Sequence, residues 1–107
     1  MKIDILGTEY TVEEKTAEQD KNMKDCDGYC DKTTKQIVVL CGFESNLHDP
    51  SWYQKKVLRH EIVHAFMFES GLHENAKIEE VQDEFLVDWI ALQGPKIYKA
   101  WEQANAI

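Results

Sequence analysis

The chain has 107 residues, of which 43% are hydrophobic and 30% charged, proportions typical of a single globular domain. Its formal net charge of −8 argues against binding to a phosphate backbone, so we expect no nucleic-acid partner. No apolar run reaches the roughly 18 residues that span a bilayer, and the first residues do not resemble a signal peptide. We therefore expect a cytoplasmic protein with no membrane partner.

The first 41 residues predict two β-hairpins. Residues 2–6 alternate apolar and polar side chains, a turn follows at Gly7-Thr8, and residues 10–15 resume with β-favouring side chains. The second hairpin comprises residues 28–30 and residues 36–41, whose unbroken β-branched run is typical of a buried strand. Residues 16–25 are compatible with either a short surface helix or a loop.

Three cysteines, Cys26, Cys30 and Cys41, lie in or near this second hairpin and cannot all pair within one chain. In a protein without a secretory signal, reduced thiols are the expected state. The spacing of Cys26 and Cys30 suggests half of a metal site, but no matching pair of Cys or His follows. We therefore predict three free thiols.

A long helix is predicted from Pro50 to about Ser70. Asp49 can cap the free N–H groups, Pro50 suits the first helical position, and Gly71 supplies a residue that commonly ends a helix. A second helix is predicted over residues 76–93, capped by Asn75. It carries an apolar stripe at three- and four-residue steps, formed by Ile78, Val81, Phe85, Trp89 and Leu92.

Gly94-Pro95 is expected to break that helix, and residues 95–104 then form a short amphipathic C-terminal helix. The predicted fold class is therefore α+β, with a small antiparallel sheet of two N-terminal hairpins packed on the long helix. No internal repeat or linker divides residues 1–107, so one domain is expected.

The long helix contains the motif His60-Glu61-Ile62-Val63-His64. Residues four apart lie on one face of a helix, about 6 Å apart along its axis, so His60 and His64 can bind one zinc ion. Glu61 lies about 100° round the helix, where it can face a zinc-bound water without being a ligand. This arrangement of two histidines and a glutamate is typical of zinc peptidases. The loop residue His48 is assigned no ligand role.

A catalytic zinc needs three protein ligands and one open position. Glu79 and Asp83, four residues apart on the second helix, can act as third ligand and as the carboxylate that orients a ligand histidine. Glu80 with Glu84 repeats this pattern one residue later. The spacing alone leaves Glu79 and Glu80 open as the third ligand.

Residues 58–66 resemble the active-site helix of gluzincin-type zinc metallopeptidases. Residues 79–85 resemble their glutamate helix, in which a ligand Glu is followed four residues on by an Asp. Within that group the chain is most similar, over roughly residues 28–92, to short phage and mobile-element proteins related to the ImmA/IrrE family. The resemblance implies zinc ligands His60, His64 and Glu79, the general base Glu61, and Asp83 in the orienting role.

The expected function is that of a zinc metalloendopeptidase, a hydrolase in which Glu61 activates a zinc-bound water to cleave peptide bonds. The expected partner is a protein or peptide substrate, with one specific regulator as a possible target. Tyr98 and His73 are candidate hydrogen-bond donors to the tetrahedral intermediate, and an exposed hairpin edge can bind an extended substrate. The alternative is a zinc-binding regulatory or interaction protein of a phage or mobile element with little or no hydrolytic activity.

Overall fold

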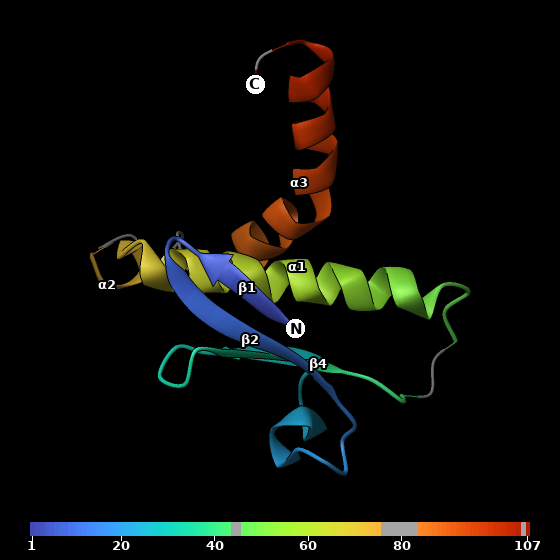
Figure 1. The fold of residues 1–107 in the computed structure, drawn as a ribbon. Helices are drawn as coiled ribbons and strands as arrows, with labels where there is room; N and C mark the ends of the chain where they lie inside the picture. The colour runs from blue at the N-terminus through green and yellow to red at the C-terminus, as the bar shows by residue number, and fades with distance from the viewer. Residues whose placement is uncertain (44–45, 76–83, 106) are drawn as a thin grey trace.

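Two antiparallel hairpins form one sheet in this computed structural model, which describes residues 1–43, 46–75, 84–105 and 107 (Figure 1). Strand β1 (Lys2–Ile5) pairs with β2 (Thr8–Lys15), and β3 (Gly28–Asp31) pairs with β4 (Gln36–Leu40). Leu6 and Gly7 between β1 and β2 have φ angles of 52° and 89°. Two consecutive positive φ angles are typical of the two-residue turn that suits the strand twist. Both predicted hairpins are confirmed.

The sheet is mixed, which corrects the prediction of an antiparallel sheet. Its strand order is β1-β2-β4-β3, and β2 and β4 run parallel with Thr11 opposite Gln36. The connection between the hairpins includes a short 3₁₀ helix, η1 (Lys21–Lys24). Consecutive residues Ile37, Val38 and Val39 of β4 are at most 3% exposed. A strand with both faces buried is typical of the interior of a sheet. Strand β4 accordingly lies between β2 and β3, and β3 lies at the edge of the sheet.

Helix α1 (Pro50–Glu69) lies across one face of the sheet (Figure 1). Its caps are those predicted: Asp49 accepts a hydrogen bond from the Trp52 N–H at 3.0 Å, and Gly71 follows the helix with a φ of 80°. Two residues of α1, Val57 and Ala65, belong to the main buried cluster. The sheet contributes the other members, Ile5, Tyr10, Val12, Ile37 and Val39. This cluster holds α1 against the sheet, and α1 also contacts edge strand β3.

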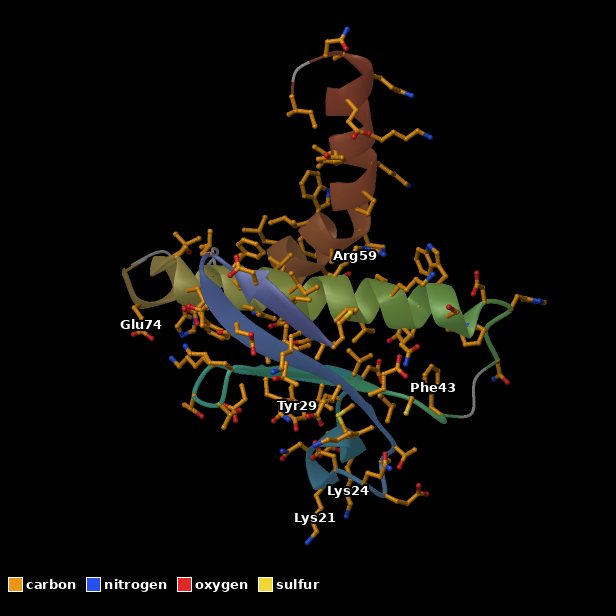
Figure 2. All side chains as sticks on the ribbon, in the orientation of Figure 1. Lys21, Lys24, Tyr29, Phe43, Arg59 and Glu74 are labelled. Carbon is orange, nitrogen blue, oxygen red and sulfur yellow. The ribbon has the colours of Figure 1, made fainter. Side chains whose placement is uncertain are left out.

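Helix α2 (Leu72–Asn75) follows α1, and helix α3 (Glu84–Gln103) completes the described chain. The predicted break at Gly94-Pro95 is wrong, because α3 is continuous through both residues. Pro95 has no N–H to donate to the carbonyl of Ala91, one turn earlier. Arg59 Nε of α1 donates to that carbonyl at 2.6 Å instead, and Figure 2 shows Arg59 where α3 meets α1. None of the described helices is long and apolar enough to cross a membrane.

Replacing Arg59 by Met should therefore lower the free energy of unfolding by about 1–3 kcal/mol, because a partly buried carbonyl loses a charged donor. Pro95→Ala restores an N–H that can reach Ala91, so the cost of Arg59→Met should be smaller in that background. Urea unfolding of the four proteins of this double-mutant cycle measures the difference. An equal cost of Arg59→Met in both backgrounds would show that Arg59 does not compensate for Pro95.

The last residue of α1, Glu69, connects the helix to two parts of the sheet. It accepts hydrogen bonds from the Tyr10 hydroxyl at 2.7 Å, the Thr8 hydroxyl at 3.1 Å and Lys35 Nζ at 2.6 Å. The hydrogen bonds from Lys35 and Tyr10 hold the pKa of Glu69 below its usual value of 4.5. The carboxylate therefore contributes stability above that value, and the contribution is lost as the pH falls through the lower pKa of the folded state.

Glu69→Gln should accordingly be less stable than the wild type at neutral pH, and the difference should shrink as the pH is lowered below about 4. Thermal unfolding followed by circular dichroism over that pH range measures it. The exposed Glu18 provides the control, since Glu18→Gln should follow the wild-type curve at every pH. A Glu69→Gln deficit that is constant with pH would exclude an ionised Glu69 as its source.

Candidate metal centre

Helix α1 places the two histidines of the motif side by side. Their ring centroids are 4.9 Å apart, and the side chains of His60 and His64 are 16% and 18% exposed. Glu61 is 7% exposed and faces β3, where its Cγ would lie 3.4 Å from a Cβ built on Gly28. The helical spacing therefore produces the predicted pair of imidazoles with a buried carboxyl next to them.

Glu84, the first residue of α3, reaches both rings. Its Oε2 lies 2.8 Å from His60 Nε2 and its Oε1 lies 3.0 Å from His64 Nε2. One donor atom from each of the three residues lies within 4.8 Å of the others. Two histidines and a glutamate are an established donor set of catalytic zinc sites, and three protein ligands leave a fourth position open. The donor set present in this chain therefore fits zinc.

The predicted third ligand Glu79, its alternative Glu80 and the predicted orienting residue Asp83 all lie outside the described residues. Among the described residues, Glu84 is the acid that reaches both histidine rings, and Asp88 follows it at the same four-residue spacing. Spacing alone did not favour this pair, because Glu79 with Asp83 and Glu80 with Glu84 have the same period. Within the described residues, Glu84 and Asp88 are identified by their contacts with the two histidines.

Asp88 lies behind His60. Its Oδ1 is 3.3 Å from His60 Nδ1, and Lys56, one turn before His60 on α1, forms an ion pair with the same oxygen. The Lys56 ammonium holds the pKa of Asp88 below its usual value, so Asp88 stays ionised. Both ring nitrogens of His60 thus face carboxylate oxygens. A hydrogen bond from Nδ1–H to Asp88 leaves the Nε2 lone pair for a metal, as carboxylates behind ligand histidines commonly do.

Removing this carboxylate should weaken metal binding without abolishing it. We expect Asp88→Ala to lower zinc affinity about 10- to 100-fold, the usual effect of losing such a partner. Competition with a chromophoric zinc chelator measures the affinity. Glu102→Ala, an exposed change on the same helix, should bind zinc as the wild type does. Wild-type affinity in Asp88→Ala would mean that Asp88 does not orient His60.

The protonation of Glu61 and His64 is set mainly by burial. Burial raises the pKa of Glu61 to about 7, with His60 acting in the opposite direction and Glu84 in the same direction. Burial also lowers the pKa of His64, which favours the neutral ring that a metal requires. A carboxyl with a pKa near neutrality can both accept and return a proton under physiological conditions.

Two cavities flank Glu61. One, of about 210 Å³, lies on the His60 side and is lined by Tyr53 and Lys56 among others. The other, of about 260 Å³, lies on the His64 side and includes Cys30 and Phe68 in its wall. A larger cavity of about 550 Å³ lies elsewhere, between the sheet and the first half of α1, and none of the three donor residues lines it. The donor group therefore lies between two modest cavities rather than in this larger one.

His73 and Tyr98, the two predicted hydrogen-bond donors to the tetrahedral intermediate, lie in different parts of the molecule. His73 packs edge-on against Phe68 with 4.7 Å between ring centroids, and Phe68 in turn stacks on His64 at 6.2 Å. Tyr98 is 54% exposed and belongs to the second half of α3, which extends away from the body of the molecule in Figure 1. Tyr53, which the sequence did not single out, lies in the His60-side cavity, and its hydroxyl donates to Asp27.

All three cysteines are free thiols. Cys30 is the one that lines the His64-side cavity, and burial raises the pKa of its thiol to about 12. A thiol with so high a pKa remains protonated at neutral pH and is a poor nucleophile and metal ligand. Cys30 therefore contributes packing to this cavity.

Comparison with models of protein families, with curated proteins and with solved structures finds no match to this chain.

Proposed function

We propose that this chain is a zinc-dependent metallopeptidase with His60, His64 and Glu84 as metal ligands and Glu61 as general base. The observation that supports the proposal most strongly is the position of Glu61. It is buried next to the donor group, at 7% exposure, yet it is not one of the three donors. A site that only stabilised the fold would gain nothing from burying a fourth ionisable group there, because that burial costs free energy.

A bound zinc ion would lower the pKa of a water molecule and polarise a peptide carbonyl. Glu61 then accepts a proton at its carboxylate and returns it to the leaving amine. Burial raises the pKa of Glu61 in the metal-free centre, and a carboxyl with a raised pKa is a better proton acceptor than an exposed one. Asp88 and Lys56 hold His60 in the orientation that keeps Nε2 directed at the donor group.

Strand β3 can support the substrate, because it forms one edge of the described sheet and its N-terminal half borders both cavities. The N–H of Leu40 donates to the carbonyl of Asp27 at 2.8 Å. In an antiparallel pair, the main-chain N–H and C=O groups of successive residues point alternately toward and away from the neighbouring strand. Because Asp27 is hydrogen-bonded to β4, the main-chain groups of Gly28 and Cys30 point away from β4. A peptide in an extended conformation can pair with such an edge.

The test is digestion of a peptide library of random sequence by zinc-loaded protein, with products identified by mass spectrometry. Cleavage should stop when 1,10-phenanthroline removes the metal and resume when zinc is added back. The metal-free protein provides the matched control. A chain that holds zinc and cleaves no member of the library would contradict the peptidase proposal.

One observation favours the alternative, a zinc-binding interaction protein. Helix α3 exposes large apolar side chains, with Phe85 at 78%, Trp89 at 49% and Tyr98 at 54% exposure. Exposed aromatic residues on one helix are typical of protein-binding surfaces. Partner capture that persists in Glu61→Gln would support this second function, since binding needs no general base.

A further inference from the structure

The two cavities beside Glu61 differ in the chemistry of their walls. Apart from Gly28, Glu61 and Glu84, which line both, the His64-side cavity is lined by rings and a thiol, those of Tyr29, Cys30, His64 and Phe68. The wall of the His60-side cavity is more strongly charged, with Asp27, Tyr53, Lys56, Val57, His60 and Asp88. The two cavities are therefore expected to accept different side chains.

Acidic groups outnumber cations in the wall of the His60-side cavity. Lys56 is the one lysine or arginine among the described residues that line it, and its ion pair with Asp88 offsets both charges. Glu61 is 7% exposed and accepts no hydrogen bond within the part of the chain that the structure describes. A buried carboxyl without a partner favours a hydrogen-bond donor or a cation in the adjoining space.

Asp27 supplies a carboxylate at the outer wall of this cavity. Its main chain is held at the edge of the sheet, because its carbonyl accepts a hydrogen bond from the Leu40 N–H at 2.8 Å. Its side chain accepts a hydrogen bond from the Tyr53 hydroxyl. Among the described residues, no cationic side chain forms an ion pair with it. The carboxylate can therefore pair with a cation from outside the chain.

The ring of Tyr53 gives the same cavity an apolar wall. Phe43 packs edge-on against this ring with 6.5 Å between centroids, and Lys56 Nζ lies 6.0 Å from the ring centroid. A long basic side chain suits such surroundings, since its stem packs on an apolar surface while its charged end pairs with a carboxylate. The volume of about 210 Å³ is below the roughly 300 Å³ of pockets for whole small molecules, so one side chain is the fitting occupant.

We propose that the His60-side cavity recognises a lysine or arginine side chain of the substrate, and that Asp27 is the residue that determines this specificity. The inference rests on the proposed peptidase function and specifies its substrate as a peptide with a basic residue on one side of the bond to be cleaved. The rings and thiol of the His64-side cavity give no such preference on the other side.

Two hydroxamates that differ only in charge test this recognition. N-acetyl-lysine hydroxamate and N-acetyl-norleucine hydroxamate carry the same zinc-binding group and the same four-carbon side chain, but only the first ends in an ammonium. Wild-type, zinc-loaded protein should bind the lysine compound about fivefold more tightly, as measured by calorimetric titration. Asp27→Asn keeps the shape and an acceptor for Tyr53 but removes the charge, so its two affinities should agree within about twofold.

Matched variants separate the charge of Asp27 from other effects. Asp25→Asn makes the same change in net charge at an exposed residue that lines neither cavity, so it should keep the wild-type affinity ratio. Tyr53→Phe leaves the Asp27 carboxylate in place and should also keep a preference for the lysine compound. Because the ratio compares two ligands on one protein, partial unfolding or partial loss of zinc affects both affinities alike.

Peptides cleaved from the random library should in turn be enriched in Lys or Arg at one position beside the cleaved bond, and Asp27→Asn should lose this enrichment. Equal hydroxamate affinities in the wild type, or an unchanged ratio in Asp27→Asn, would overturn the role of Asp27 and leave the peptidase proposal standing. A wild-type chain that takes up no zinc, or holds zinc and binds neither hydroxamate, would overturn the proposed function and this inference with it.

Discussion

His60→Ala should abolish zinc binding, and Glu84→Ala should weaken it by more than the roughly 10- to 100-fold expected for Asp88→Ala. The reason is geometric. His60 Nε2 and His64 Nε2 are held by one helix, and within the part of the chain that the structure describes Glu84 is the group that reaches both, at 2.8 and 3.0 Å. Removing one histidine leaves two donors, too few for a catalytic zinc site. Elemental analysis of the purified proteins after dialysis against zinc gives the metal content per chain.

Glu79→Ala is the informative comparison for Glu84→Ala. If Glu84 is the third ligand, Glu79→Ala should retain about one zinc per chain, in the manner of the wild type. Zinc retained by Glu84→Ala and lost by Glu79→Ala would return the ligand role to the residue that the sequence favoured. A wild-type protein that takes up no zinc even when it is added back would exclude a metal centre of either composition.

Glu61→Gln should lose peptide hydrolysis by about 10²- to 10⁴-fold while keeping its zinc. Glutamine has nearly the same shape as glutamate but cannot accept a proton at its carboxamide oxygen under these conditions. Because Glu61 is not one of the three donors, the replacement should leave the metal content unchanged. Single-turnover cleavage of a peptide found in the library digestion measures the chemical step.

Glu74→Gln provides the control for this replacement. Glu74 is an exposed residue of α2 whose partner is Lys32 at 2.9 Å, a surface pair that contributes little to stability. Its rate should equal that of the wild type. Undiminished hydrolysis by Glu61→Gln would remove Glu61 from the mechanism, whereas loss of zinc would show that Glu61 supports the metal centre rather than the proton transfer.

Much of the local structure follows from the sequence. Alternating side chains and turn residues predicted both hairpins, and Asp49, Pro50 and Gly71 predicted the bounds of α1 to within about one residue. The four-residue interval between His60 and His64 also determined that the two rings share a helix face. In each case the information lies within a few residues of chain, so dihedral preferences and helical period are sufficient.

Contacts between distant segments decided the rest. Strand β4 lies between β2 and β3, and its parallel pairing with β2 makes the sheet mixed. No short window of sequence determines that pairing. A donor from Arg59, 32 residues before Ala91, let α3 continue through Pro95. The local rule for proline correctly describes a missing hydrogen bond, but it cannot foresee a replacement from another helix.

In the candidate metal centre, too, local sequence determines some features and packing between distant segments determines the others. The sequence by itself determined that two histidines share one helix face and that a glutamate lies about 100° round the helix from His60, because their spacing is a property of the helix alone. Only the tertiary structure brought Glu84 and Asp88 to the two histidines, and only it placed Gly28 against Glu61. Those choices depend on where α3 and β3 pack on α1, and packing is governed by the shape and burial of surfaces far apart in the chain.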